Sequence, residues 1–161
     1  MCGLLGTVYG SKARQPEERS YLKWLFMHLL LLSERRGPYA TGIAWLKEDG
    51  SHKIFKRPMR AVEFAKEKQF LEMISQVDDN TTWLAGHTRW PTQGSHLNNA
   101  NNHPLVSRTS TAGGANMHTG VCILTHNGHI GNAAMLFRAL GIRREAQVDS
   151  EILLRLAERN L

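Results

Sequence analysis

The chain has 161 residues, of which 42% are hydrophobic and 21% charged, so a single globular domain with a real core is expected. Its formal net charge is +6, but the basic residues stand in small scattered groups without the interleaved aromatic residues of a nucleic-acid binder. Two cysteines make no disulfide framework, and the longest apolar stretch, Tyr21 to Leu32, is too short for a membrane span, so a reducing, cytoplasmic setting is expected.

The first part of the chain predicts a short strand followed by a long helix. Residues 2–9 are small and apolar, as in a buried strand. Pro16, followed by two glutamates, is typical of a helix start, where the helix dipole favours acidic groups. The apolar positions of the stretch 21–32 cover more than one stripe, which predicts a helix over 16–35 that is buried on most sides. A basic last turn before Gly37 predicts where this helix ends.

A hairpin, a second helix and another strand should follow. Two short strands, 41–46 and 52–55, flank an Asp-Gly pair of the kind found in hairpin turns. Apolar residues return at helical spacing over 61–77, which predicts one helix. Residues 82–86 have the composition of a strand, and they lead directly into the polar motif segment 86–94.

The second half of the chain is less periodic. The asparagine-rich stretch 95–102 and the polar stretch 109–118 both predict irregular loops. Residues 121–125 form the most strand-like run of the sequence, and a helical pattern over 132–141 follows after an Asn-Gly turn. Asp149 is a capping residue before a last apolar pattern, which predicts a helix from there to the C-terminus.

Cys2 is the most reactive candidate in the chain, because removal of the initiator methionine would expose it as the N-terminal residue. One residue would then carry both a thiol and a free α-amine. The thiolate is the attacking species, and an α-amine has an ordinary pKa of about 7.7–8.0, near that required of a general base for acyl transfer. N-terminal threonine nucleophiles work in this way. The alternative is that Cys2 is a small apolar residue at the start of a strand.

Four separated stretches of the chain carry residue types that suit one chemistry. They are Met1-Cys2-Gly3, Arg36-Gly37 with Thr41-Gly42-Ile43-Ala44, Gly86-His87-Thr88-Arg89-Trp90 with Thr92 and Gly94, and His126-Asn127-Gly128 with Asp149-Ser150-Glu151. In this order they resemble the class II glutamine amidotransferases, the glutaminase domains with an N-terminal nucleophile. Their spacing is similar to that in the glutaminase domain of glucosamine-6-phosphate synthase. The match runs from Met1 to about Leu156.

The resemblance implies a role for each matching residue. Cys2 would attack the side-chain amide of L-glutamine, with its own α-amine as the base. Asn127, through its side-chain amide, and Gly128, through its backbone N–H, would form the oxyanion hole. Arg89 would hold the α-carboxylate of the substrate and Asp149 its α-ammonium group. The other matching positions are Trp90, Thr92 and His103 in the glutamine pocket and Arg36 as a supporting residue near the nucleophile.

These residue types suit the chemistry without the family. An amide under attack develops negative charge on its oxygen, and one well-placed donor there contributes about 2.7–4 kcal/mol. A free amino acid carries a carboxylate and an ammonium group, for which an arginine fork and an aspartate are natural partners. Taken singly, however, Arg89 could be a structural ion-pair residue, Asp149 a helix cap and Asn127-Gly128 a turn.

The resemblance implies an α+β fold of the N-terminal nucleophile hydrolase type, a four-layer αββα sandwich, with residues 1–161 as one glutaminase domain. Two departures qualify it. Gln93 stands where the synthase relatives tend to have histidine, in a peripheral pocket position. Family domains also continue past the last helix with further strands, so this domain should be shortened at its C-terminal end and its second sheet incomplete or completed by other residues. An open sheet favours a homo-oligomer or association with another chain.

The predicted function is glutaminase activity that releases glutamate and ammonia through a thioester on the nucleophile, with the ammonia passed to a synthase domain or subunit. Two alternatives stay open. An amidohydrolase acting on another amide is disfavoured by the pair of Arg89 and Asp149, which suits a free amino acid. A non-catalytic regulatory or interaction domain of the same fold is the other. No cofactor is expected, and a metal site of Cys122, His126 and His129 is disfavoured because the spacing matches no zinc pattern.

Overall fold

The computed structural model describes residues 1–10, 13–107 and 121–160 of the chain. The elements, in chain order, are β1 (Gly3–Val8), α1 (Pro16–Ser33), the 3₁₀ turn η1 (Glu34–Arg36), β2 (Ala40–Lys47), β3 (His52–Arg57), α2 (Ala61–Phe64), α3 (Lys68–Ser75), β4 (Thr81–Arg89), the 3₁₀ turn η2 (Asn99–Asn101), β5 (Leu105–Val106), β6 (Ile123–Leu124), α4 (Ala133–Ala139) and α5 (Glu151–Asn160). The fold is mixed α+β, as predicted. The predicted loop 109–118 lies outside the described residues.

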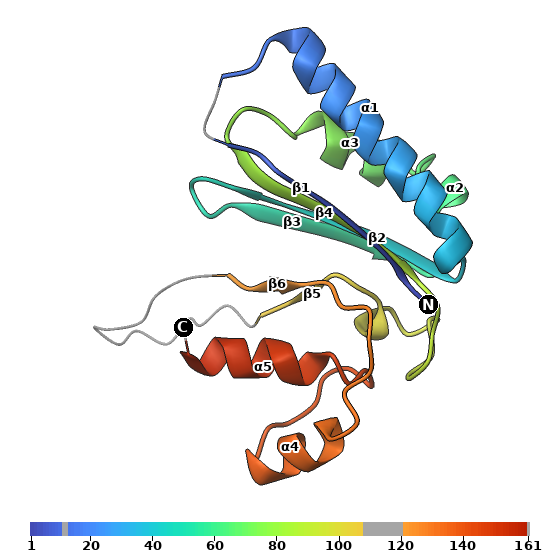
Figure 1. Ribbon diagram of the computed structural model, residues 1–161, viewed down its shortest axis with the longest axis vertical. Coiled ribbons are helices and arrows are strands. Elements are labelled where there is room, and N and C mark those ends of the chain that lie inside the picture. The colour runs from blue at the N-terminus through green and yellow to red at the C-terminus, as the bar shows by residue number, and fades with distance from the viewer. Residues whose placement is uncertain (11–12, 108–120, 161) are drawn as a thin grey trace.

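The elements form four layers, as Figure 1 shows. Helices α1, α2 and α3 cover one face of a four-stranded antiparallel sheet with the strand order β1-β4-β2-β3. The two-stranded sheet of β5 and β6 lies on the opposite side, with α5 and α4 beyond it. This layer order agrees with the αββα arrangement that the resemblance implies, and the second sheet has two strands in the described part of the chain. The N-terminal nucleophile fold itself stays a prediction.

Helix α1 is buried on one side only, so the prediction of burial on most sides is wrong. Phe26 and Leu30 belong to the main core and are at most 1% exposed, whereas Tyr21, Trp24 and Leu32 are 59%, 48% and 61% exposed. A helix in an outer layer can bury only the stripe that faces the sheet, so its other apolar residues face outward. None of the described helices is long and apolar enough to cross a membrane.

The helix predicted over 61–77 is interrupted, and forms the two shorter helices α2 and α3. Phe64 and Phe70 are both completely buried, and their rings meet edge to face with centroids 5.5 Å apart. In one continuous helix, residues six positions apart differ by about 120° in direction, so both rings could not enter the same core. The break before α3, where Glu67 has an extended backbone, allows both rings to do so.

Two strands differ in length from the prediction. The sequence predicts a strand over 82–86, but β4 runs on to Arg89, so much of the polar motif belongs to a central strand. β6, predicted over 121–125, has only two residues, and both are half-buried. The hairpin of β2 and β3 is confirmed, as are the helices predicted over 132–141 and after Asp149.

Two glycines let the segments around the N-terminus approach one another closely. Gly3 pairs with Thr88 in the β1–β4 ladder, and a Cβ at Gly3 would lie 2.5 Å from Thr88 Oγ1 and 2.9 Å from Ser33 O. Gly37 ends the helical segment as predicted, but its backbone is extended (φ −163°). A Cβ at Gly37 would lie 2.6 Å from both Thr88 O and Trp90 N, so contact with β4 requires glycine there.

The substitution Gly3→Ala should destabilise the protein by about 1–3 kcal/mol, because the added methyl group would overlap atoms of two neighbouring elements. Gly10→Ala is the matched control, since no atom lies within 4 Å of a Cβ built there. Denaturant unfolding measures both variants. Equal stability of the two would contradict the close packing of β1 against β4 and α1.

Candidate active site

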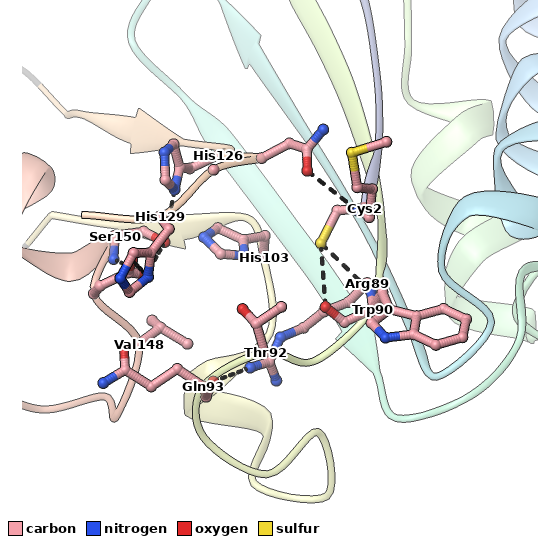
Figure 2. A pocket seen from close by; sticks show the side chains of 14 residues that line it. Cys2, Arg89, Trp90, Thr92, Gln93, His103, His126, His129, Val148 and Ser150 are labelled. Atoms are coloured by element: carbon pink, nitrogen blue, oxygen red, sulfur yellow. Dashed lines mark hydrogen bonds and ion pairs between the residues drawn. The ribbon is translucent and has the colours of Figure 1, made fainter. Parts of the chain in front are cut away.

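One cavity of about 510 Å³ lies where the start of β1, the end of β4 and the loops before α4 and α5 meet. Its lining residues are Met1, Cys2, Arg89, Trp90, Thr92, Gln93, His103, His126, Asn127, Gly128, His129, Val148, Asp149 and Ser150. Figure 2 shows it at close range. The cavity brings together every site residue predicted from the sequence except Arg36, which lines an adjoining hollow with Met1, Arg35 and Trp90.

Cys2 lies immediately before β1, and its thiol faces the cavity beside Trp90 (Figure 2). The backbone N–H of Trp90 donates to Cys2 Sγ at 3.4 Å, and the thiol lies 3.5 Å from Trp90 O. The backbone N of Cys2 donates to Asn127 Oδ1 (3.2 Å), and Arg36 Nε donates to Cys2 O (3.0 Å). The thiol, the backbone nitrogen and the carbonyl oxygen of Cys2 are therefore each held by a different segment of the chain.

Asn127 and Gly128 form the turn after β6, and both line the cavity. Because Asn127 Oδ1 accepts the bond from Cys2, the amide nitrogen Nδ2 is not used in that bond and can act as a donor. A Cβ at Gly128 would lie 2.7 Å from His126 Nε2, so glycine lets the His126 ring fold back over the turn. The turn thus presents a side-chain donor and a backbone N–H next to the residue that holds the thiol.

Arg89 is 3% exposed at the end of β4, and its guanidinium is fixed by the loops that follow. Nη2 donates to Gln93 O (2.5 Å) and Gly94 O (2.9 Å), and Nη1 donates to Asn102 Oδ1 (2.9 Å). None of these partners is a carboxylate. Burial lowers the pKa of Arg89, with the Cys2 thiol opposing this shift. Among the described residues these bonds use three of the five N–H groups of the fork, and the other two could bind a ligand.

Asp149 lies in the wall of the cavity, just before α5, and is 6% exposed. Its Oδ2 accepts from the backbone N of Ile130 (2.6 Å), and its Oδ1 accepts from the backbone N of Ser150 (2.9 Å). His129 Nδ1 lies 3.3 Å from Oδ2. The carboxylate therefore ties the segment after the Asn-Gly turn to the start of α5, and it still offers lone pairs to the cavity.

His103 is a buried residue in the wall of the cavity, and its ring packs at a tilt against that of His87, with centroids 4.6 Å apart. Neither ring nitrogen of His103 has a hydrogen-bond partner within the described ranges. The backbone on both sides of His103 is held by Lys56, whose Nζ donates to Asn102 O (2.5 Å) and Pro104 O (3.0 Å). Burial lowers the pKa of Lys56 to about 8 and that of His103 well below its usual 6.5.

Sequence reasoning missed the residues that hold the site together. Asn102, completely buried, anchors Arg89, and His87 reaches the loop before Asn127 from the central strand. The four asparagines of the stretch 95–102 were the available signal for Asn102, because an aperiodic loop rich in amides must find partners if it is buried. Across the described residues, no group of three or more His, Cys, Asp or Glu side chains is arranged to hold a metal ion.

Comparison with curated proteins identifies homologues that carry a class II glutamine amidotransferase domain at the N-terminus, and the resemblance predicted from the sequence is confirmed. The glutamine–fructose-6-phosphate aminotransferase (isomerizing) of Geobacillus kaustophilus is 29% identical over 161 residues, covering 99% of this chain and 22% of the relative. Two proteins of the same name from Staphylococcus epidermidis strains are 29% identical over 160 residues, covering 98% and 22%. No family model matches the chain.

The chain thus spans 22% of the length of these relatives. The remaining length of the relatives has no counterpart in this sequence.

Acid should destabilise this site through its buried histidines. Burial lowers the pKa of His87 to about 4 and that of His103 well below 6.5. Between pH 6.5 and about 4 the unfolded chain therefore binds more protons than the folded one, so stability is lost as the pH falls through this window. For His87 alone the loss should be on the order of 3 kcal/mol.

Urea unfolding at half-unit pH steps from pH 7 to 4 measures the slope of the free energy of unfolding against pH. His103→Leu should flatten it. Thr82→Val removes a hydroxyl at the far end of β4 that donates to the backbone O of Leu46 (3.1 Å), and should leave the slope unchanged. A slope that is the same in the wild type and in His103→Leu would show that His103 does not stay neutral in the folded state.

Proposed function

We propose that this chain is a glutaminase domain, which hydrolyses L-glutamine to glutamate and ammonia through a γ-glutamyl thioester on Cys2. One observation carries the proposal: a thiol, an oriented amide donor, an arginine fork and an aspartate line the same cavity. The homologues support it, because they are named as aminotransferases for which glutamine is the amino donor. The volume of about 510 Å³ lies within the range of small-molecule sites.

The chemistry would run in two halves. The α-amine of Cys2, freed by removal of Met1, takes the thiol proton while Sγ attacks the side-chain carbonyl carbon of glutamine. The resulting oxyanion receives hydrogen bonds from Asn127 Nδ2 and the Gly128 N–H. The proton then passes to the leaving amide nitrogen, ammonia departs and the thioester remains. Water, deprotonated by the same amine, attacks the thioester and releases glutamate and the thiol.

Recognition of the amino-acid end would fall to Arg89 and Asp149. The two unused N–H groups of Arg89 suit a carboxylate, and the carboxylate of Asp149 suits an ammonium group. An amide substrate without these two charges would supply no partner for the two remaining N–H groups of Arg89 or for the remaining lone pairs of Asp149. This argument favours glutamine over the other amides that a related amidohydrolase could use.

The acceptor of the ammonia is also part of the proposal. The relatives are several times longer than this chain, so a synthase domain or a separate subunit would use the ammonia released here. Fructose-6-phosphate is the acceptor named for the relatives, and for this chain the acceptor stays open. The alternative of a non-catalytic domain predicts the same cavity without turnover.

The nucleophile can be tested by labelling. A diazoketone analogue of glutamine should modify Cys2, because a thiol at the end of an Arg–Asp pocket meets the electrophile in place of the substrate amide. Intact mass before labelling shows whether Met1 is removed, since retained Met1 acylates the proposed base. Cys2→Ser should keep the fold and lose most of the turnover. Cys122→Ser is the control and should be labelled like the wild type. Labelling of Cys122 alone would exclude the mechanism.

Recognition of the carboxylate can be tested with two ligands. Arg89→Lys keeps the charge but loses the planar fork, so the affinity for glutamine should fall at least tenfold. Glutaminamide, which lacks the α-carboxylate, should bind the variant and the wild type about equally. Arg57→Lys, on the exposed part of β3, is the control. Calorimetric titration on the Cys2→Ser background avoids turnover, and equal losses for both ligands would assign Arg89 a purely structural role.

A further inference from the structure

His87 is a buried residue of the central strand whose side chain reaches the loop that carries the predicted oxyanion hole. It is completely buried, and in the sheet it lies opposite Leu4 of β1 and Gly42 of β2. Its Nε2 lies 3.2 Å from the backbone O of His126, the residue before Asn127. No contact between His87 and the predicted substrate groups is needed for this connection, because it runs through the loop backbone.

The acceptor in this bond determines which ring nitrogen of His87 carries a hydrogen. A carbonyl oxygen can only accept, so Nε2 of His87 must carry a hydrogen. Nδ1 has no partner in the described part of the chain, and a second buried imidazole, His103, packs at a tilt against the ring. Burial disfavours a charged His87 ring, and the nearby charges of Arg89 and Lys56 also oppose protonation. The arrangement therefore suits the neutral Nε2–H tautomer.

The same loop is held at two further points. His126 Nδ1 lies 3.2 Å from Ser150 Oγ, and Asp149 Oδ2 accepts from the backbone N of Ile130. Both of these bonds lead to the start of α5. The bond from His87 joins the loop backbone to the central strand of the four-stranded sheet, whereas the bond from the backbone N of Cys2, just before β1, reaches the side chain of Asn127. The His87 bond therefore connects the loop that carries Asn127 and Gly128 to the sheet whose strand β1 follows Cys2.

We propose that His87 is a positioning residue: as the neutral Nε2–H tautomer, it holds the His126 carbonyl and thereby sets the distance between the Asn127–Gly128 donors and the thiol of Cys2. This inference rests on the proposed glutaminase function. A donor that is misplaced by loop movement stabilises the oxyanion less, while the groups that bind the amino-acid end are unaffected. His87 should thus influence the chemical step and not substrate binding.

The test compares three variants of the full chain. His87→Leu removes the donor and keeps an apolar side chain, His87→Gln can place an amide N–H where Nε2 stands, and Thr81→Val is a buried control at the other end of the same strand. We expect kcat for glutamine hydrolysis to fall at least tenfold in His87→Leu with KM within about twofold. His87→Gln should recover most of kcat, and Thr81→Val should change neither constant.

Hydrogen exchange of the Asn127 and Gly128 backbone amides provides a readout that needs no activity. Exchange should be faster in His87→Leu than in the wild type, His87→Gln or Thr81→Val. Wild-type protein without glutaminase turnover would refute the proposed function, and the exchange result would then decide the positioning role alone. Unchanged exchange in His87→Leu, or equal loss of kcat in the Leu and Gln variants, would overturn the inference.

Discussion

The pairing of β1 with β4 is the constraint on which the site depends. β4 pairs with β1 on one side and with β2 on the other, so its register fixes both neighbours. With Gly3 opposite Thr88, Cys2 emerges beside Trp90, and Arg89 ends the strand at the same edge. A shift of one residue would turn every side chain of β1 to the other face and move glycine away from the position where Thr88 leaves no room for a Cβ.

The other half of the site consists of loops that are held by buried polar groups. β5 and β6 have two residues each, so the second sheet supplies few ladder bonds. Asn102, Lys56 and Asp149 provide hydrogen bonds to side chains and backbone groups instead. Buried polar groups cost free energy unless they are paired, so these loops are constrained as strongly as an apolar core. His103 is an exception, since its ring nitrogens find no partner in the described structure and face a cavity where a substrate could supply one.

Features with local signals could be predicted from the sequence, and features that arise between distant segments could not. The hairpin at Gly50 and the start of α1 follow from turn and capping chemistry within a few residues. The break between α2 and α3 depends on how Phe64 and Phe70 share one core, which periodicity cannot show. Periodicity likewise shows that α1 is apolar but not which of its sides meets the sheet.

The candidate site divides in the same way. The family resemblance predicts the individual site residues, and the cavity contains all of these except Arg36, which lines the adjoining hollow. The motifs carry no signal for the contacts that hold these residues. His87 lies within a motif, yet its bond to the backbone of His126 joins positions in separate parts of the chain. Asn102 similarly reaches Arg89 from a loop whose sequence shows only an excess of amides.

The structural and functional interpretations of the site residues are compatible. Asp149 binds the backbone at the start of α5, Asn127 and Gly128 form a turn, and Arg89 fixes the loop after β4. Each of these residues lines the cavity and has donors or acceptors that the bonds described above do not use. A side chain that is already desolvated and held in place loses little freedom when a ligand arrives, so its structural bonds are the means by which it would be preorganised. Loss of folding stability on substitution at these positions is therefore expected from either role, and only ligand-dependent measurements distinguish the two.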